Sequence, residues 1–257
     1  MYSLKDKIVF ITGASSGIGR SCAEAFASLG ARLLLAARRR ERLAELAAGL
    51  AEKHGVRVHA FGLDVRDQPA VERAVAGLPA EWSAIEVLVN NAGLSRGLDK
   101  LHQGLLQDWE EMIDTNVKGL LYVSRAVIPG MVARNSGHII NLGSIAGREV
   151  YVGGNVYCAT KFAVAALSKG LRLDLNGTPL RVSEVAPGLV ETEFSIVRYH
   201  GDREKAGKAY QGMTPLTGDD IADAVVYCAT RPPHVNISEL VVMPTAQAAT
   251  FLVHRQP

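Results

Sequence analysis

The stretch Lys7-Ile8-Val9-Phe10-Ile11-Thr12-Gly13-Ala14-Ser15-Ser16-Gly17-Ile18-Gly19 runs from an apolar segment into a glycine-rich turn. Residues 7–12 predict a buried strand, and residues 17–29 predict a helix that opens at the end of the turn. The glycines permit a tight turn whose backbone can approach a pyrophosphate, and the N–H groups and dipole of the following helix favour its charge. The stretch therefore predicts a dinucleotide site made by Gly13, Ser15, Ser16, Gly17, Ile18 and Gly19.

Short apolar runs alternate with longer amphipathic stretches along the rest of the chain. Further strands are expected at 32–37, 56–61, 85–90, 138–142, 181–186 and 239–243. Further helices are expected at 42–53, 109–127, 156–175 and 219–228. Strands that are apolar along their whole length are typical of parallel sheets covered on both faces. The alternation predicts one α/β domain over residues 1–257, with a doubly wound parallel sheet and helices on both faces.

Residues 188–218 form the longest stretch with no clear periodic pattern. Long loops in compact domains are often lids or binding loops. We therefore expect contacts with a small-molecule substrate in this region.

Composition excludes several classes of function. A net charge of +2, with the cations spread along the chain, does not favour a nucleic-acid partner. Cys22, Cys158 and Cys228 are far apart and lack metal-ligand spacing, which fits a reducing compartment and no metal site. No segment approaches the roughly 18 consecutive apolar residues of a membrane helix. The polar start of the chain leaves no room for a signal peptide before the first strand, so we expect a cytoplasmic protein that does not bind membranes.

The end of the second expected strand indicates which cofactor is bound. An NAD site usually has an acidic residue about 20 positions beyond the glycines. Here the sequence reads Ala36-Ala37-Arg38-Arg39, without a carboxylate. Arginine suits a 2′-phosphate by charge and bidentate geometry. The alternative is a helix start that is merely basic, although cations are unfavourable there. Arg38 and Arg39 therefore favour NADP over NAD.

The segment Tyr157-Cys158-Ala159-Thr160-Lys161 places a phenol and an amine four positions apart. On a helix these side chains are neighbours. A free tyrosine has a pKa of about 10, and a nearby cation favours the phenolate and lowers that value. The alternative is an ordinary amphipathic helix. The spacing indicates an acid/base tyrosine for proton transfer at a hydroxyl or carbonyl oxygen.

Taken in order along the chain, these features resemble the short-chain dehydrogenase/reductase family. The matching elements are the glycine turn, Asp64-Val65, Asn90-Asn91-Ala92-Gly93, Asn116, Ser144, the Tyr157/Lys161 pair and Pro187-Gly188. The resemblance covers essentially the whole chain. It implies a single Rossmann-type domain with a seven-stranded sheet, assembled as a homotetramer or a dimer.

The resemblance also implies residue roles. Tyr157 would be the general acid/base, and Ser144 would hydrogen-bond the reacting oxygen. Lys161 would lower the tyrosine pKa and hold the nicotinamide ribose, while Asn116 would anchor a water that links Lys161 to solvent. The remaining cofactor contacts would be Asp64 and Val65 at the adenine, Asn91, Ala92 and Gly93 at the adjacent ribose, and Pro187, Gly188, Val190 and Thr192 at the nicotinamide. Taken singly, Ser144 could be a strand-end cap, Asn116 a residue that bonds locally, and Asp64 a turn former.

Two segments of the C-terminal half, 193–199 and 244–247, resemble the branch that oxidises serine, allo-threonine and other short 3-hydroxy acids with NADP. Such a substrate carries a carboxylate that needs a cation in the pocket. Arg198 lies in the expected substrate region and Arg148 lies four residues after Ser144, so either could supply a guanidinium. Each could also be a surface arginine.

The sequence thus predicts an NADP-dependent oxidoreductase that transfers a hydride between the cofactor and a short 3-hydroxy acid or the matching 3-oxo acid or semialdehyde. One alternative keeps the catalytic residues but takes a 3-oxoacyl thioester, a neutral ketone or an alcohol. A remote alternative is a non-catalytic NADP-binding regulatory protein, which would be expected to lack Tyr157 or Lys161.

Overall fold

A seven-stranded sheet in the order β3-β2-β1-β4-β5-β6-β7 forms the centre of the molecule, and every neighbouring pair of strands is parallel. The computed structural model describes residues 2–256, so the limits 1 and 257 of the predicted domain lie outside the described range. The strands are β1 (Ile8–Thr12), β2 (Arg32–Ala37), β3 (Val58–Gly62), β4 (Ile85–Asn90), β5 (His138–Leu142), β6 (Arg181–Pro187) and β7 (Glu239–Val242). The predicted fold, a doubly wound seven-stranded parallel sheet, is confirmed.

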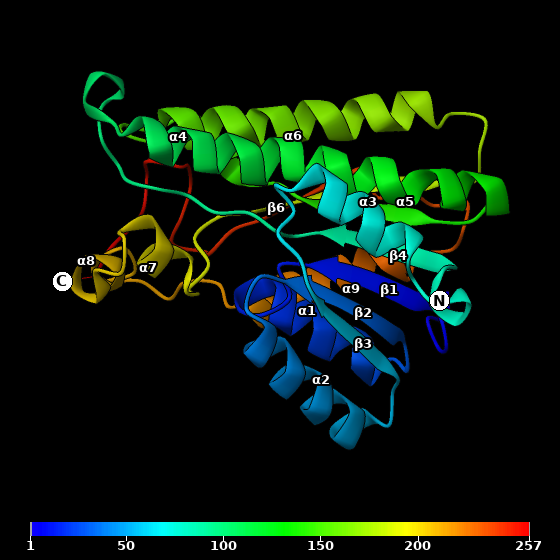
Figure 1. Cartoon of the computed structure of the whole chain (residues 1–257). Coiled ribbons are helices and arrows are strands. Elements are labelled where there is room, and N and C mark those ends of the chain that lie inside the picture. The colour runs from blue at the N-terminus through cyan, green and yellow to red at the C-terminus, as the bar shows by residue number, and fades with distance from the viewer. Residues whose placement is uncertain (1, 257) are drawn as a thin grey trace.

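Helices cover both faces of this sheet (Figure 1). They are α1 (Gly17–Ser28), α2 (Arg40–His54), α3 (Gln68–Ala76), α4 (Leu106–Ile113), α5 (Leu120–Arg134), α6 (Asn155–Asp174), α7 (Phe194–Arg198), α8 (Arg203–Lys208) and α9 (Gly218–Ala229). Helices α1, α2 and α9 lie on one face, and α3, α5 and α6 lie on the other, while α7 and α8 project beyond one end of the sheet. Among residues 2–256, no helix is both long enough and apolar enough to cross a membrane.

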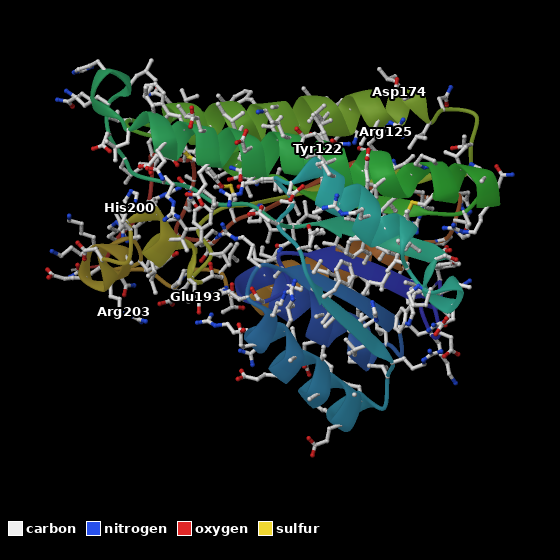
Figure 2. All side chains as sticks on the ribbon, viewed as in Figure 1. Tyr122, Arg125, Asp174, Glu193, His200 and Arg203 are labelled. Carbon is white, nitrogen blue, oxygen red and sulfur yellow. The ribbon has the colours of Figure 1, made fainter. Side chains whose placement is uncertain are left out.

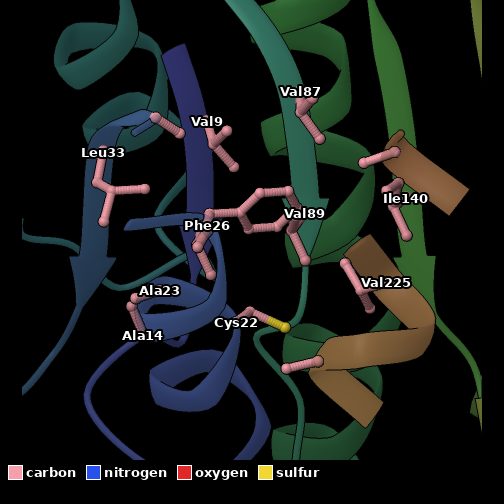
Figure 3. Packing of buried hydrophobic residues seen from close by; sticks show 14 of the residues in the cluster. Val9, Ala14, Cys22, Ala23, Phe26, Leu33, Val87, Val89, Ile140 and Val225 are labelled. Atoms are coloured by element: carbon pink, nitrogen blue, oxygen red, sulfur yellow. The ribbon is translucent and has the colours of Figure 1, made fainter. Parts of the chain in front are cut away.

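Strand β1 shows why the central strands are apolar along their whole length. Val9 and Ile11 are buried in the cluster beneath α1 and α9, whereas Ile8 and Phe10 are buried in the cluster on the opposite face. Figure 3 shows the first cluster, with the ring of Phe26 from α1 beside the central strands. Burying a side chain of this size contributes about 1.5–3 kcal/mol. Because helices cover both faces, neither set of alternate positions can be polar.

The order of the strands reverses at β1, which pairs with β2 on one side and with β4 on the other. In open α/β sheets, ligands bind beyond the carboxyl ends of the strands at such a switch point. The glycine turn after β1 and the loop after β4 therefore meet at the expected binding crevice.

The structure departs from the predicted elements in three places. The helix expected at 109–127 is two helices, α4 and α5, joined by a π-helical turn at Asp114–Gly119, which 3.6-residue periodicity does not reveal. Helix α3 was not predicted, although Asp67 caps it by accepting a hydrogen bond from the backbone of Ala70. The third difference is that the unassigned stretch 188–218 contains two short helices, α7 and α8.

Candidate active site

A cavity of about 650 Å³ opens at the carboxyl ends of the strands. It extends from the glycine turn, past the end of β2, to the loops that follow β5 and β6. Of the predicted site residues, the cavity wall includes all except Gly19, Asn116 and Arg148. The tertiary structure thus brings residues from most of the chain length to one surface.

The turn after β1 and the loop after β4 are joined by Thr12. Its hydroxyl accepts hydrogen bonds from the backbone N–H groups of Asn91 and Ala92, both at 3.1 Å. Gly13 adopts a φ of +65°, and a Cβ there would lie 2.9 Å from the Cα of Ala92, so only glycine fits between these loops. A Cβ on Gly19 would lie 2.5 Å from the carbonyl oxygen of Gly13. Gly19 therefore allows close packing of helix and turn, and its predicted contact with the cofactor remains a prediction.

The end of β2 brings two guanidinium groups to the rim of the cavity. Arg39 donates from Nε to Ser15 Oγ at 3.2 Å and from Nη2 to Ser16 Oγ at 2.5 Å. Arg38 lies farther out, with Nη1 3.5 Å from Glu111 Oε1. Residues 38–40, which follow β2, are all arginines, and Ser15 and Ser16 add hydroxyl donors. Such a set suits a phosphorylated ribose better than a free one. The residues present therefore fit NADP.

Three polar side chains meet at the inner end of the cavity. Tyr157 and Lys161 project from α6, and Ser144 follows β5. Ser144 Oγ accepts a hydrogen bond from the backbone of Ala146 at 3.1 Å and donates to the carbonyl oxygen of Pro187 at 3.4 Å. Lys161 Nζ donates to the carbonyl oxygen of Leu142 at 2.8 Å and lies 5.9 Å from the centroid of the Tyr157 ring. This arrangement can exchange a proton with a ligand oxygen and hold it with a second donor.

Burial and the charge of Arg198 have opposite effects on the pKa of Tyr157. Burial raises the pKa of its phenol above the ordinary value, and the charge of Arg198 and the hydrogen bond from Ser144 oppose that rise. The guanidinium carbon of Arg198 lies 5.3 Å from the ring centroid of Tyr157. In this structure Lys161 Nζ is directed at Leu142, and the cation that favours the phenolate is Arg198. The predicted effect of Lys161 on the pKa of Tyr157 remains a prediction.

The burial of Lys161 destabilises the folded protein. Burial lowers the pKa of its amine from 10.5 to about 8, and the charge of Glu184 partly opposes this shift. The unfolded chain binds this proton more tightly, so the free energy of unfolding falls as pH falls from 10.5 to about 8 and stays reduced below that. We expect Lys161→Met to raise the unfolding free energy at pH 7 by about 1–2 kcal/mol, after subtracting the lost bond to Leu142. The gain should shrink at pH 10.

Urea denaturation at pH 7 and at pH 10 measures this effect. Lys53→Met, which removes an exposed lysine of α2, is the control and should show no such pH-dependent gain. If Lys161→Met destabilises the protein at pH 7, or raises the free energy of unfolding equally at both pH values, then burial of the Lys161 charge does not destabilise the fold.

Asn116 lies in the π-helical turn and holds two neighbouring elements together. Its Oδ1 accepts from the backbone of Leu94 at 2.8 Å, and its Nδ2 donates to the Leu94 carbonyl at 2.8 Å and to Thr160 Oγ1 at 3.0 Å. The side chain thus fixes the loop after β4 against α6. Its predicted role as the anchor of a water remains a prediction.

Of the two candidate arginines, Arg198 lines the cavity. It lies at the end of α7 and donates from Nε to Ser95 Oγ at 3.1 Å and from Nη2 to Tyr151 Oη at 3.0 Å. Within residues 2–256, Nη1 has no hydrogen-bond partner. Arg198 therefore presents a positioned cation with a free donor beside Tyr157.

Arg148 does not line the cavity, so its predicted role at the substrate is wrong. Its guanidinium donates to the fully buried carboxylate of Glu184 at 3.0 Å and to Glu239 at 2.9 Å. These ion pairs direct the side chain from the short turn after Ser144 towards β6 and β7. A spacing of four residues did not reveal this because the two carboxylates come from distant strands.

Sequence reasoning missed Thr12, Ser95 and Tyr151 as site residues. Thr12 joins the two cofactor loops, and the other two hold Arg198 in place. Ser95 and Tyr151 lie close to glycines, at 93 and at 153–154, which marked their loops as candidates. Their pairing with Arg198 had no local signal, because it joins residues 103 and 47 positions apart.

Comparisons with known proteins extend over nearly the whole chain. A family model described as short chain dehydrogenase matches residues 7–202, a range that includes every predicted site residue. NADP-dependent 3-hydroxy acid dehydrogenase YdfG of Salmonella typhi is 52% identical over 250 residues, 96% of this chain and 99% of that protein. Sulfoacetaldehyde reductase 2 of Chromohalobacter salexigens is 47% identical over 250 residues, 96% of this chain and 98% of that protein. The solved closed form of serine dehydrogenase complexed with NADP+ has a TM-score of 0.91 and 50% identity, covering 97% of this chain and 100% of that one.

Proposed function

Because the chain belongs to the short-chain dehydrogenase family, we propose that it is an NADP-dependent oxidoreductase acting on short 3-hydroxy acids such as serine and allo-threonine. The relatives named for 3-hydroxy acids and for serine support this substrate class. The relative named for sulfoacetaldehyde is consistent with a pocket for small anions.

The position of Arg198 is the observation that carries the proposal. Its guanidinium carbon lies 5.3 Å from the ring centroid of Tyr157, inside the same cavity. A carboxylate bound by this guanidinium would place a hydroxyl of a three-carbon acid within reach of the phenol. A neutral ketone would leave the same cation without a partner, which makes the acid the better fit.

The chain's own residues would then divide the work as follows. In its phenolate form, which the charge of Arg198 favours, Tyr157 takes the proton of the substrate hydroxyl and becomes the neutral phenol. Ser144 hydrogen-bonds the same oxygen, and Arg198 holds the carboxylate. Lys161, anchored on Leu142, faces the end of the cavity expected to hold the nicotinamide ribose. The bound nicotinamide supplies the hydride chemistry. In the reverse direction Tyr157 returns the proton to the carbonyl oxygen.

A substrate panel with NADP tests this function. It should contain L- and D-serine, allo-threonine, 3-hydroxypropionate, 3-hydroxyisobutyrate and several neutral ketones or alcohols. We expect turnover of the 3-hydroxy acids at much higher kcat/KM than of the neutral compounds. Preference for the neutral compounds would overturn the proposed substrate class while leaving the family membership intact.

The role of Arg38 is tested by its replacement. We expect Arg38→Ala to weaken NADP binding about tenfold or more, as the loss of a charge-assisted contact to the 2′-phosphate would, and to leave NAD binding unchanged. Calorimetric Kd values for both cofactors provide the measurement. Equal weakening of NADP and NAD would show that Arg38 does not contact the 2′-phosphate.

We also propose that the protein is a cytoplasmic homotetramer. The exposed apolar side chains Leu106, Leu121, Phe162 and Leu173 of helices α4, α5 and α6 support an assembly that covers these helices. Sedimentation equilibrium of the purified chain tests the oligomeric state, and a monomer would contradict it.

A further inference from the structure

Glu193 connects the substrate side of the cavity to the cofactor side. It immediately precedes α7, the helix that ends in Arg198, and Figure 2 labels it where this loop approaches the start of α1 and α2. Its Oε2 accepts a hydrogen bond from Arg39 Nη1 at 2.7 Å, and its Oε1 accepts from Arg42 Nη1 at 2.7 Å. One carboxylate thus joins residues 151 and 154 positions away in sequence.

The guanidinium of Arg39 is held on both of its sides. Nη1 is bound to Glu193, while Nε and Nη2 face the hydroxyls of Ser15 and Ser16 on the glycine turn. A guanidinium is a rigid planar fork, so a partner on one nitrogen fixes where the opposite edge points. Glu193 therefore orients the Nε/Nη2 edge of Arg39 towards the turn where the phosphates of the cofactor are expected.

The segment 192–198, which contains Glu193 and α7, has one further contact near each end. Thr192 packs on the glycine turn, since a Cβ built on Gly17 would lie 3.2 Å from Thr192 Cβ. Near the other end of α7, Arg96 donates to the carbonyl oxygen of Val197 at 2.7 Å. Because Arg96 anchors one end of this segment, a displacement of Arg39 and Glu193 at the other end would change the position of α7, which carries Arg198.

We propose that Glu193 is a positioning residue that couples the 2′-phosphate of the cofactor, through Arg39, to the substrate helix α7. The statement that α7 positions a substrate-binding residue rests on the proposed function. Coupling between two sites is reciprocal. If the ion pair of Glu193 with Arg39 strengthens binding of the 2′-phosphate, then binding of the 2′-phosphate must strengthen that ion pair and so stabilise the position of α7. NADP therefore stabilises the position of α7, and with it that of Arg198, more than NAD does.

An ion pair at the surface with no functional effect is the competing explanation, because the side chains of Arg39 and Glu193 are each 41% exposed. The hydrogen bond from Arg39 is the main reason that the pKa of Glu193 lies below its ordinary value, so the carboxylate is charged at neutral pH. Glu24 offers a matched comparison: its side chain is 40% exposed and it pairs with Lys53 and His54. It does not line the main cavity.

Binding of two cofactor fragments tests the coupling without turnover. The ratio of calorimetric Kd values for 5′-AMP and 2′,5′-ADP reports what the 2′-phosphate contributes. We expect Glu193→Gln to lower this ratio about two- to fivefold, the size of effect typical of an exposed ion pair, and Glu24→Gln to leave it unchanged. Glu193→Asp, which keeps the charge, should restore part of the ratio. A ratio that is unchanged or increased in a folded Glu193→Gln protein overturns the proposal.

The link to α7 has its own measurement. In the parent protein, 2′,5′-ADP should slow amide hydrogen exchange in residues 194–198 more than 5′-AMP does, and Glu193→Gln should remove the difference. Equal protection by both fragments in the parent protein overturns the coupling. Failure of the proposed function would appear separately, as absence of turnover of 3-hydroxy acids by the parent enzyme.

Discussion

Tyr157→Phe is expected to lower kcat for 3-hydroxy acids by about 10³-fold, within the range that general acid–base catalysis contributes. The substitution removes only the phenolic oxygen, and the ring of Phe194 packs against the same site with centroids 5.6 Å apart. The cavity should therefore keep its shape. Steady-state rates with NADP at saturating substrate measure the loss.

The control for this variant is cofactor affinity. The Kd of NADP should stay within about a factor of two, because the contacts expected at the glycine turn and at Arg38 are untouched. A Tyr157→Phe protein as active as the parent would rule out Tyr157 as the acid/base, whatever the substrate is.

Arg198→Ala is expected to lower kcat/KM for L-serine by roughly 30- to 100-fold, the lower end of the range for removing one partner of a buried charge pair, because Arg198 is only partly buried. The loss should appear mainly in KM, since the carboxylate contact exists in both the bound ground state and the transition state. Arg198→Lys should recover only part of it, because an ammonium cannot replace the fork that contacts Ser95 and Tyr151.

A second readout separates the two effects of Arg198. Since its charge opposes the rise in the pKa of Tyr157, removing it should raise that pKa further. The pH profile for oxidation of a neutral alcohol should then shift to higher pH, although this substrate has no carboxylate to lose. Arg73→Ala, an exposed change on α3, is the control. An unchanged KM for serine would refute the carboxylate contact, and an unshifted profile would refute the electrostatic one.

Much of the fold could be read from local pattern. Strands buried on both faces must be apolar throughout, so the seven runs stood out, and the glycines at 13 and 17 marked the switch point of the sheet. Periodicity could not predict the π-helical turn that holds Asn116, because one extra residue in a turn leaves the apolar pattern nearly unchanged. Helix α3 was missed because its nine residues bury only Val71.

Site residues could be predicted where the interacting side chains belong to one helix, strand or turn. They could not be predicted where a contact joins elements that are far apart in the sequence. The spacing of Tyr157 and Lys161 placed both on one face of α6, as the structure shows. It could not show that Lys161 turns to Leu142, or that the cation favouring the phenolate comes from α7. Arg148 and Arg198 were both candidates in sequence, with Arg198 the one in the expected substrate region, and the structure separates them: Arg148 pairs with buried Glu184 and Arg198 lines the cavity.

The sequence by itself determined the parallel sheet, the dinucleotide turn and the preference for a 2′-phosphate, because each depends on residues within one strand, turn or helix. Only the tertiary structure decided which arginine lines the cavity, which charge acts on Tyr157, and that Glu193 reaches Arg39. These contacts join segments that are 41 to more than 150 residues apart, and their geometry follows from how the sheet and its loops pack. Electrostatic effects depend on the distance between charges and on their burial. Sequence spacing predicts these quantities only for residues within the same helix, strand or turn.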